Sequence, residues 1–166
     1  MAKAYASTAA AATGLLLLLL LAPNASLAEA AKPAPRDATA VQNCLKAPRG
    51  KELNGERCIG VVADPCLKKA GTTADMNTCA DRELAVWDAM LNDNYRSLAE
   101  HLDDEQKAKA RDMQRAWIES RDKTCAFYWD FYQGTIASPM GSYCVLRETA
   151  RRAMFLKFFL DESKGR

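Results

Sequence analysis

The sequence has few of the residues from which catalytic and metal sites are most often built. It contains a single histidine, His101, and its six cysteines include no Cys-x-x-Cys pair. Zinc sites usually need such pairs, and a nucleophilic cysteine needs a nearby base. Acidic residues are plentiful, but none lies in the apolar setting that a glycosidase-like acid catalyst requires. We therefore predict no catalytic residues, no metal site, no cofactor and no enzyme activity.

A strong charge of one sign is also missing. The chain has 23 basic and 21 acidic residues, which gives a net charge of +2 at pH 7. Nucleic-acid-binding domains carry a concentrated excess of lysine and arginine. No nucleic-acid partner is therefore predicted.

The longest apolar run, residues 15–22, is too short to cross a membrane. It follows Lys3 and precedes Ser26-Leu27-Ala28, a small-x-small triplet, whereas a membrane helix needs about 20 apolar residues. This pattern is typical of a secretory signal peptide, here residues 1–28, and a transmembrane anchor is the competing interpretation. We expect an exported mature protein, periplasmic or secreted, without a membrane span.

All six cysteines lie beyond the predicted signal peptide. They are Cys44, Cys58, Cys66, Cys79, Cys125 and Cys144. An even number of cysteines in an exported chain predicts disulfides. Six cysteines can pair in many ways, and the sequence alone does not decide among them. The helices predicted below favour Cys125–Cys144 and Cys66–Cys79, and leave Cys44–Cys58 as the third pair.

Two long stretches without glycine or proline predict an antiparallel helical hairpin. The first helix begins near Thr73, where Thr72 and Asp75 resemble a capping box. Its buried face recurs every three or four residues, at Leu84, Trp87, Leu91, Tyr95, Leu98 and Leu102. Asp103 is a suitable cap for a second helix that runs to about residue 130. The short connection makes the two helices antiparallel neighbours.

A loop and a third helix follow the hairpin. The segment 133–141 is predicted to be irregular because of Gly134, Pro139 and Gly141, and Ser142 is a suitable cap for a helix over residues 143–160. At least one of Phe155, Phe158 and Phe159 is expected to close the base of the domain. The predicted fold class is all-α: an antiparallel helical hairpin plus a third helix, stapled by disulfides, with an irregular N-terminal extension.

The N-terminal part of the mature chain is predicted to lack long helices. Residues 29–43 are rich in alanine and proline and read as a flexible leader, apart from a short helical turn beginning at Val41. Residues 44–71 form an extension that contains cysteines. Within it, the segment from Cys58 to Cys66 is too short for a helix of its own and is stopped by Pro65. The helical domain occupies residues 72–162.

One face of the second helix carries an unusual mixture of side chains. Gln114, Trp117, Arg121 and Cys125 recur at intervals of three and four residues. We interpret them as an internal layer packed on Asn92 and Tyr95 of the first helix, because a buried arginine or indole N–H needs partners. Trp87 is assigned a structural role as well. The alternative is that Gln114, Trp117 and Arg121 form a row facing a ligand.

Several spaced motifs resemble the N-terminal domain of the lysozyme inhibitor LprI family. They are Cys66 and Cys79; Trp87-Asp88-x-x-Leu91-Asn92-x-x-Tyr95; Gln114-Arg115-Ala116-Trp117-Ile118-x-x-Arg121-Asp122-x-x-Cys125; Gly141-Ser142-x-Cys144; and Thr149-x-x-Arg152. The resemblance implies an exported, helical, disulfide-bonded domain and, through the named member, inhibition of lysozyme. The chain departs from that member in having no lipid-attachment cysteine and no further domain, and Cys44 and Cys58 lie outside the shared core.

Inhibition of a lysozyme would need a surface that fills or covers its cleft. The candidate partner-binding residues lie in and beside the predicted loop: Tyr132, Gln133, Thr135 and Ser138. The acidic run Glu100, Asp103, Asp104 and Glu105 is a second candidate, although helix capping explains it more simply. The predicted partner is lysozyme or another envelope protein; the alternative function is an envelope interaction module without catalytic activity. The sequence does not predict the oligomeric state.

Overall fold

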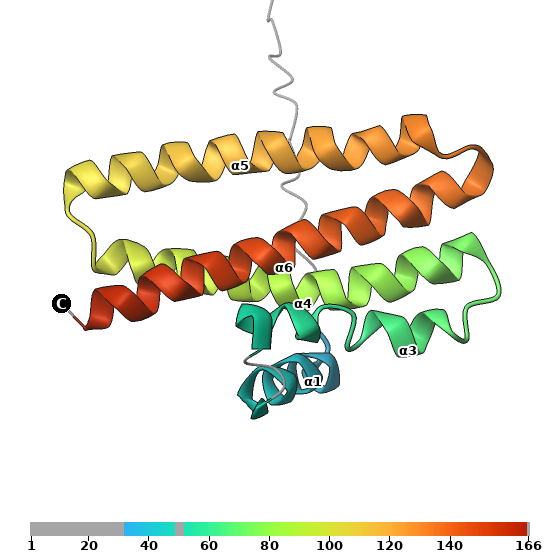
Figure 1. Cartoon of the computed structure of the whole chain (residues 1–166), viewed down its shortest axis with the longest axis horizontal. Coiled ribbons are helices and arrows are strands. Elements are labelled where there is room, and N and C mark those ends of the chain that lie inside the picture. Colours follow the sequence, from blue (N-terminus) through green and yellow to red (C-terminus); the bar gives the residue numbers. More distant parts are fainter. Residues whose placement is uncertain (1–31, 49–51, 166) are drawn as a thin grey trace, which may run out of the picture.

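The structure, a computed structural model, describes residues 32–48 and 52–165, and within these ranges it contains helices and no strand (Figure 1). The elements are α1 (Pro35–Lys46), the 3-10 helix η1 (Glu52–Cys58), α3 (Ala63–Leu67), α4 (Thr73–Glu100), α5 (Asp104–Phe131), the 3-10 helix η2 (Gly134–Ile136) and α6 (Ala137–Lys164). The prediction of an all-α fold is confirmed. The predicted signal peptide and residues 29–31 lie outside the described residues.

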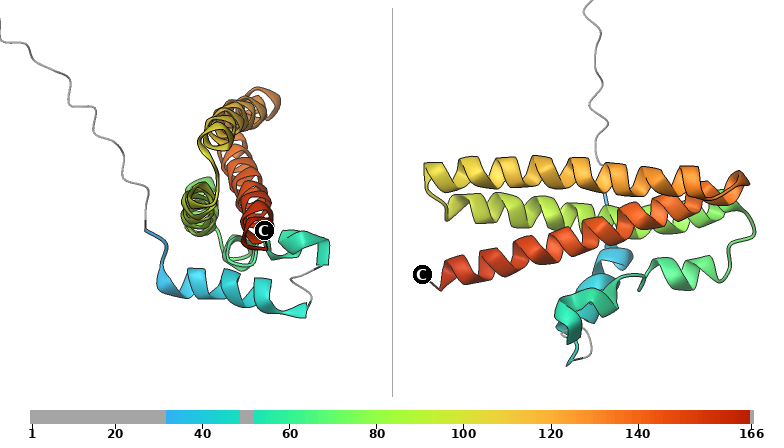
Figure 2. Two further views of the ribbon diagram at one scale, coloured as in Figure 1. Left: turned by 90° about the vertical axis from the view of Figure 1, so that its left-hand side faces the viewer. Right: turned by 45° about the horizontal axis from the view of Figure 1, so that its top comes forward.

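The three long helices form the body of the molecule. α4 and α5 run antiparallel and are joined by a short turn, as predicted, but they barely contact each other, and α6 packs against both of them (Figures 1 and 2). The core lies mainly between α4 and α6, where Trp87, Leu91 and Leu98 meet Ala153 and Leu156. α5 buries much less, since only Ala110 and Cys125 of its described residues are fully buried. Most of α5 is therefore exposed surface.

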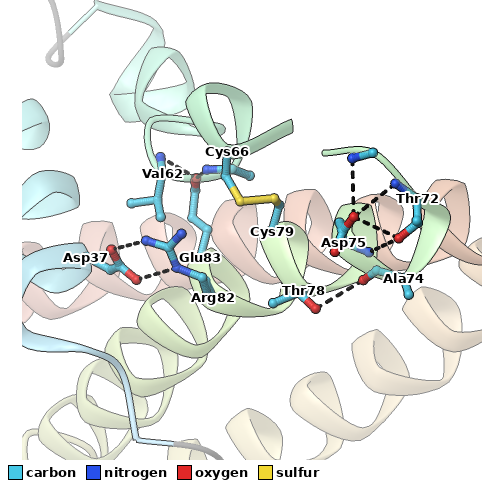
Figure 3. Close-up of a disulfide and its surroundings, with 12 residues drawn as sticks. Asp37, Val62, Cys66, Thr72, Ala74, Asp75, Thr78, Cys79, Arg82 and Glu83 are labelled. Carbon is cyan, nitrogen blue, oxygen red and sulfur yellow. Dashed lines mark hydrogen bonds and ion pairs between the residues drawn. A yellow bond between two sulfur atoms is a disulfide. The ribbon is translucent and has the colours of Figure 1, made fainter. Parts of the chain in front are cut away.

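Both caps of the hairpin form as predicted. Asp75 N donates to Thr72 Oγ1 at 3.1 Å, and Thr72 N donates back to Asp75 Oδ2 at 3.0 Å (Figure 3). Asp103 and Gln106 make the same reciprocal pair at the start of α5. The side-chain bond from Thr72, followed by backbone donors, lowers the pKa of Asp75. These local bonds fix the first residues of α4 and α5.

α6 begins at Ala137, earlier than predicted, and the expected loop is correspondingly shorter. Pro139 occupies the first turn of α6, where a missing N–H is not a loss. Gly141 lies inside the helix, and a Cβ there would approach Trp129 Nε1 to 2.6 Å. Ser142 caps nothing; its hydroxyl donates to Asn77 Oδ1 at 3.0 Å. The proline and the glycine were wrongly taken as helix breakers.

Residues 35–43 are not a flexible leader, because they form most of α1. Val41 is fully buried, and the almost fully buried Asp37 accepts two hydrogen bonds from Arg82 of α4, at 3.0 and 2.7 Å (Figure 3). The hydrogen bond with Asp37 raises the pKa of Arg82. The prediction failed because this partner lies far away in the sequence.

The extension also contains a short helix, α3, contrary to the prediction. Pro65 is the third residue of α3 and lies in its first turn, where a proline is tolerated. Cys66 follows it directly. Cys66 is bonded to Cys79 of α4, Cys44 of α1 to Cys58 of η1, and Cys125 of α5 to Cys144 of α6. The favoured set of three disulfides is confirmed.

The three phenylalanines near the C-terminus do not close the base of the domain. Phe155, Phe158 and Phe159 are all exposed. Leu156, which lies between Phe155 and Phe158, and Leu160, which follows Phe159, take the inner face of α6 instead. None of the helices that the structure describes is long and apolar enough to cross a membrane.

Candidate functional site

A buried carboxylate joins the N-terminal extension to α4. Glu83 Oε1 accepts hydrogen bonds from Gly60 N at 2.7 Å and from Trp87 Nε1 at 2.9 Å. Glu83 Oε2 accepts from Val62 N (Figure 3) and from Ala63 N, both at 2.8 Å. Glu83 has no exposed surface. Because all four donors come from within the chain, we assign the carboxylate to architecture and not to catalysis.

The apolar pattern of α4 does not single out Glu83. The signal that identifies it is its spacing, because Glu83 stands one helical turn before Trp87 on the apolar face. Gly60 has a positive φ of 97°, which turns the chain so that consecutive backbone N–H groups converge on the carboxylate. The site thus depends on a glycine turn that the helix pattern alone does not reveal.

Gln114 and Trp117, two residues of the predicted polar layer, contact an arginine of α6 that was not assigned to this layer. Arg152 Nε donates to Gln114 Oε1 at 2.9 Å, and the Arg152 guanidinium carbon lies 5.4 Å from the centre of the Trp117 ring. Arg121 lies 5.0 Å from the same ring and forms an ion pair with Asp122 at 2.7 Å. Burial lowers the pKa of Arg152. Two cations therefore flank one indole.

The expected contact of this layer with Asn92 is wrong. Asn92 is exposed and donates to Asp88 Oδ2 at 3.1 Å on its own helix, because it lies next to the buried face of α4 and not on it. Asn94 makes the contact between helices instead, donating to the Ala153 carbonyl at 2.9 Å. Tyr95 is half-buried against the core, as expected.

Among the predicted partner-binding residues, Gln133 and Thr135 are exposed, and Tyr132 is half-buried. They follow the end of α5, at the α5–α6 corner on the right of Figure 1. Ser138 does not project: it is half-buried in α6 and accepts a hydrogen bond from Asn77 Nδ2 at 2.7 Å. Three of the four residues therefore remain available to a partner.

An exposed aromatic group, not identified from the sequence, adjoins these residues. Phe127 is 63% and Phe131 65% exposed, and their ring centres are 5.9 Å apart. Phe131 packs edge-on against Tyr132 at 5.2 Å. The high density of aromatic residues in 127–132 was the feature of the sequence from which this surface could have been identified. We call this surface the aromatic tip, and it consists of Phe127, Phe131, Tyr132, Gln133, Thr135 and Ile136.

The base of the aromatic tip is held in place by a covalent bond and a side-chain bond. Cys125 and Cys144 join the last turns of α5 to the first turns of α6. Arg147 Nη2 donates to the Tyr128 hydroxyl at 3.0 Å, and the Tyr128 ring stacks on Tyr132 with 5.9 Å between centres. The tip is thus an apolar projection on a rigid support.

The histidine and the cysteines do not come together in the part of the chain that the structure describes. His101 is exposed at the end of α4, and all six cysteines are in disulfides. In residues 32–48 and 52–165, no three histidine, cysteine or acidic side chains are grouped closely enough to hold a metal ion. We carry the aromatic tip forward as the candidate site because its exposed rings are suited to binding.

Comparisons with known proteins give a family match and a curated relative. The family model described as lysozyme inhibitor LprI matches residues 66–156. An uncharacterized protein of Rhizobium meliloti (strain 1021) is 30% identical over 116 residues, which cover 61% of this chain and 84% of that protein. No solved structure matches.

Proposed function

Since the chain belongs to the lysozyme inhibitor LprI family, we propose that it is an exported protein that binds a lysozyme and blocks its cleft or the adjoining surface. The three disulfides agree with a periplasmic or extracellular location, because such bonds persist in oxidising compartments. The observation that carries the choice of surface is the aromatic tip, whose phenyl rings are exposed on a rigid base.

The aromatic tip has the composition of a binding anchor. Aromatic side chains dominate the energetics of protein interfaces, and fully desolvated rings at the centre contribute most. Phe127 and Phe131 expose more than half of their surface, with the polar groups of Gln133 and Thr135 beside them. We propose that the rings enter an apolar part of the lysozyme cleft and that the polar groups bond at its edge.

The rigidity of the support favours tight binding. A loop that must become ordered on binding loses affinity, whereas a surface already in its bound shape does not. The Cys125–Cys144 bond and the Arg147–Tyr128 bond constrain both sides of the tip. We therefore propose that the tip binds without rearrangement.

The acidic run at the other end of the hairpin is better explained by helix structure. Asp103 is the N-cap of α5, and Asp104 and Glu105 form ion pairs with Lys107 and Lys109. With Asp104 and Glu105 paired to lysines and Asp103 engaged as the cap, the run attracts a basic partner less strongly than its four acids suggest. We place it outside the proposed contact surface.

The test is a peptidoglycan-clearing assay with the purified mature chain and several lysozymes. We expect inhibition by the wild type and a loss of at least about tenfold in potency for Phe131→Ala combined with Gln133→Ala, equal to about 1.4 kcal/mol. Ile118→Ala is the matched control, because Ile118 is an exposed apolar residue of the same helix, away from the tip.

The outcomes separate the parts of the proposal. If a micromolar excess of the protein inhibits none of the lysozymes, the proposed function is rejected. The alternative, an envelope interaction module with another partner, then remains. Inhibition that is equal in the wild type and the tip variant would retain the function and reject the aromatic tip as its surface.

A further inference from the structure

The C-terminal half of α6 exposes a second aromatic cluster that the proposed function does not use. Phe155 is 42%, Phe158 58% and Phe159 40% exposed. Their rings touch, with centres 5.0 Å apart for Phe155 and Phe159 and 5.4 Å for Phe158 and Phe159. Contiguous exposed aromatic surface of this kind marks an interaction site.

Two opposite charges stand at the ends of this cluster. Arg151, Phe155, Phe158 and Glu162 follow one another at intervals of four, three and four residues, which places them on one face of α6. We call this row the α6 stripe. It carries a positive charge, two phenyl rings and a negative charge, in that order.

The α6 stripe is complementary to itself when two copies run antiparallel. The midpoint between Arg151 and Glu162 coincides with the midpoint between Phe155 and Phe158. A twofold axis through that point therefore brings each Arg151 opposite Glu162 of the second copy, and each Phe155 opposite Phe158 of the second copy. A twofold dimer requires this correspondence: if a residue of the first copy contacts a given residue of the second, the same two positions also contact each other with the copies exchanged.

We propose that the α6 stripe binds the same stripe of a second copy of this chain, forming an antiparallel, twofold-symmetric dimer. Among the described residues, no ion pair involves Glu162, so its exposed carboxylate is free to take a partner. Arg151 bonds Glu148 and Glu56 but stays 46% exposed. A groove of about 620 Å³ beside the stripe, lined by Met154 and Phe158 among others, has room for the facing rings.

The charges argue against other kinds of occupant. A membrane surface is bound by apolar rings flanked by lysine and arginine, whereas one end of the α6 stripe is acidic and the nearby Lys157 is already paired with Asp161. A strongly acidic or strongly basic protein would be attracted by the charge at one end of the α6 stripe and repelled by the charge at the other. A second copy places an opposite charge at each end, where Glu162 of one copy joins the ion pairs that Arg151 of the other makes with Glu56 and Glu148.

Sedimentation velocity of the mature chain, from low micromolar to near-millimolar concentration, tests the proposal. We expect a monomer–dimer equilibrium for the wild type and only monomer for Phe158→Asp. Glu162→Arg puts like charges opposite each other at both ends of the interface, so the dissociation constant should rise about tenfold. Arg151→Glu should have the same effect for the same reason.

An equimolar mixture of the two charge variants gives the sharpest result. In a heterodimer of Arg151→Glu with Glu162→Arg, each end pairs opposite charges again, so the mixture should associate about as well as the wild type and better than either variant alone. Because Arg151 has partners within its own chain, melting curves of each variant check that the fold is intact. Glu162→Arg removes no ion pair within the described chain.

Three results would overturn the dimer. The first is a wild type that stays monomeric over the whole concentration range. The second is a wild-type dimer that Glu162→Arg and Phe158→Asp do not weaken, which would assign the interface to another surface such as the aromatic tip. The third is a mixture that associates no better than its components, which would reject the antiparallel register.

Discussion

The indole nitrogen of Trp87 donates a hydrogen bond to the carboxylate of Glu83, 2.9 Å away, and neither side chain has any exposed surface. The remaining acceptor positions of this carboxylate bind three backbone N–H groups of residues 60–63. One side chain thus connects the core tryptophan of α4 to the segment that precedes α3. Removing its charge should affect both parts of the molecule.

We expect Glu83→Gln to lower the free energy of unfolding by about 3 kcal/mol, because the amide nitrogen is a donor and would face a backbone donor. Denaturant unfolding measures the change. Glu119→Gln is the control: Glu119 is exposed and pairs only with Lys123, so it should cost less than about 1 kcal/mol. Equal stability of the two variants would contradict the role given to Glu83.

Trp117→Ala should lower stability by about 2 kcal/mol and leave inhibition of lysozyme unchanged, because the half-buried ring supports Arg121 and Arg152 inside the molecule. Trp117→Phe keeps a ring between the two cations and should cost less. Melting curves and the clearing assay are compared for both variants. Loss of inhibition without a change in melting temperature would make this layer the contact surface.

Replacing both Cys125 and Cys144 by serine should reduce stability by about 3 kcal/mol and also weaken inhibition, because the aromatic tip loses its covalent support. The Cys44 and Cys58 pair serves as the control. Its removal loosens α1 and η1, which are remote in sequence from the tip, so potency should stay at the wild-type value. If both pairs had the same effect on potency, the support would not be specific.

Stability at alkaline pH should depend on Tyr143, whose hydroxyl donates to Asp64. Burial, followed by this hydrogen bond, raises the pKa of Tyr143 above its ordinary value. Since the unfolded chain ionises first, near pH of about 10, the stabilisation is complete below that pH and is lost as the pH rises above it.

The measurement compares the wild type with Tyr143→Phe in denaturant at several pH values. The difference in unfolding free energy should be about 1 kcal/mol at neutral pH and should shrink above pH of about 10. Tyr132→Phe is the control and should show no such trend, because the contacts of Tyr132 are with the rings of Tyr128 and Phe131. A Tyr143 difference that stays constant up to pH of about 11 would reject the explanation.

The sequence was sufficient where structure is decided by near neighbours. α4 and α5 begin where Thr72 and Asp103 can cap them, since the bonds involved span three residues. The favoured cysteine pairs were correct for a related reason, because each pair lies on elements that follow one another in the chain. The resemblance to the lysozyme inhibitor LprI family also agreed with the match over residues 66–156.

The sequence was insufficient where a distant residue decides. α1 depends on the pairing of Asp37 with Arg82, and the buried position of Glu83 depends on the path of residues 60–63. Gly141 is tolerated inside α6 because the Trp129 indole packs on it. Asn92 was wrongly assigned to the polar layer, because it lies on α4 next to the buried face and not on it. The functional role of the aromatic tip stays a prediction.

The three disulfides have a consequence for how the protein matures. Each joins one cysteine to the next along the chain, with separations of 14, 13 and 19 residues, and no bridge encloses another. For a chain that crosses a membrane N-terminus first, every cysteine therefore meets its correct partner as soon as that partner emerges. A simple thiol oxidase acting in order of arrival produces the native bonds, and no isomerase is required to rearrange them.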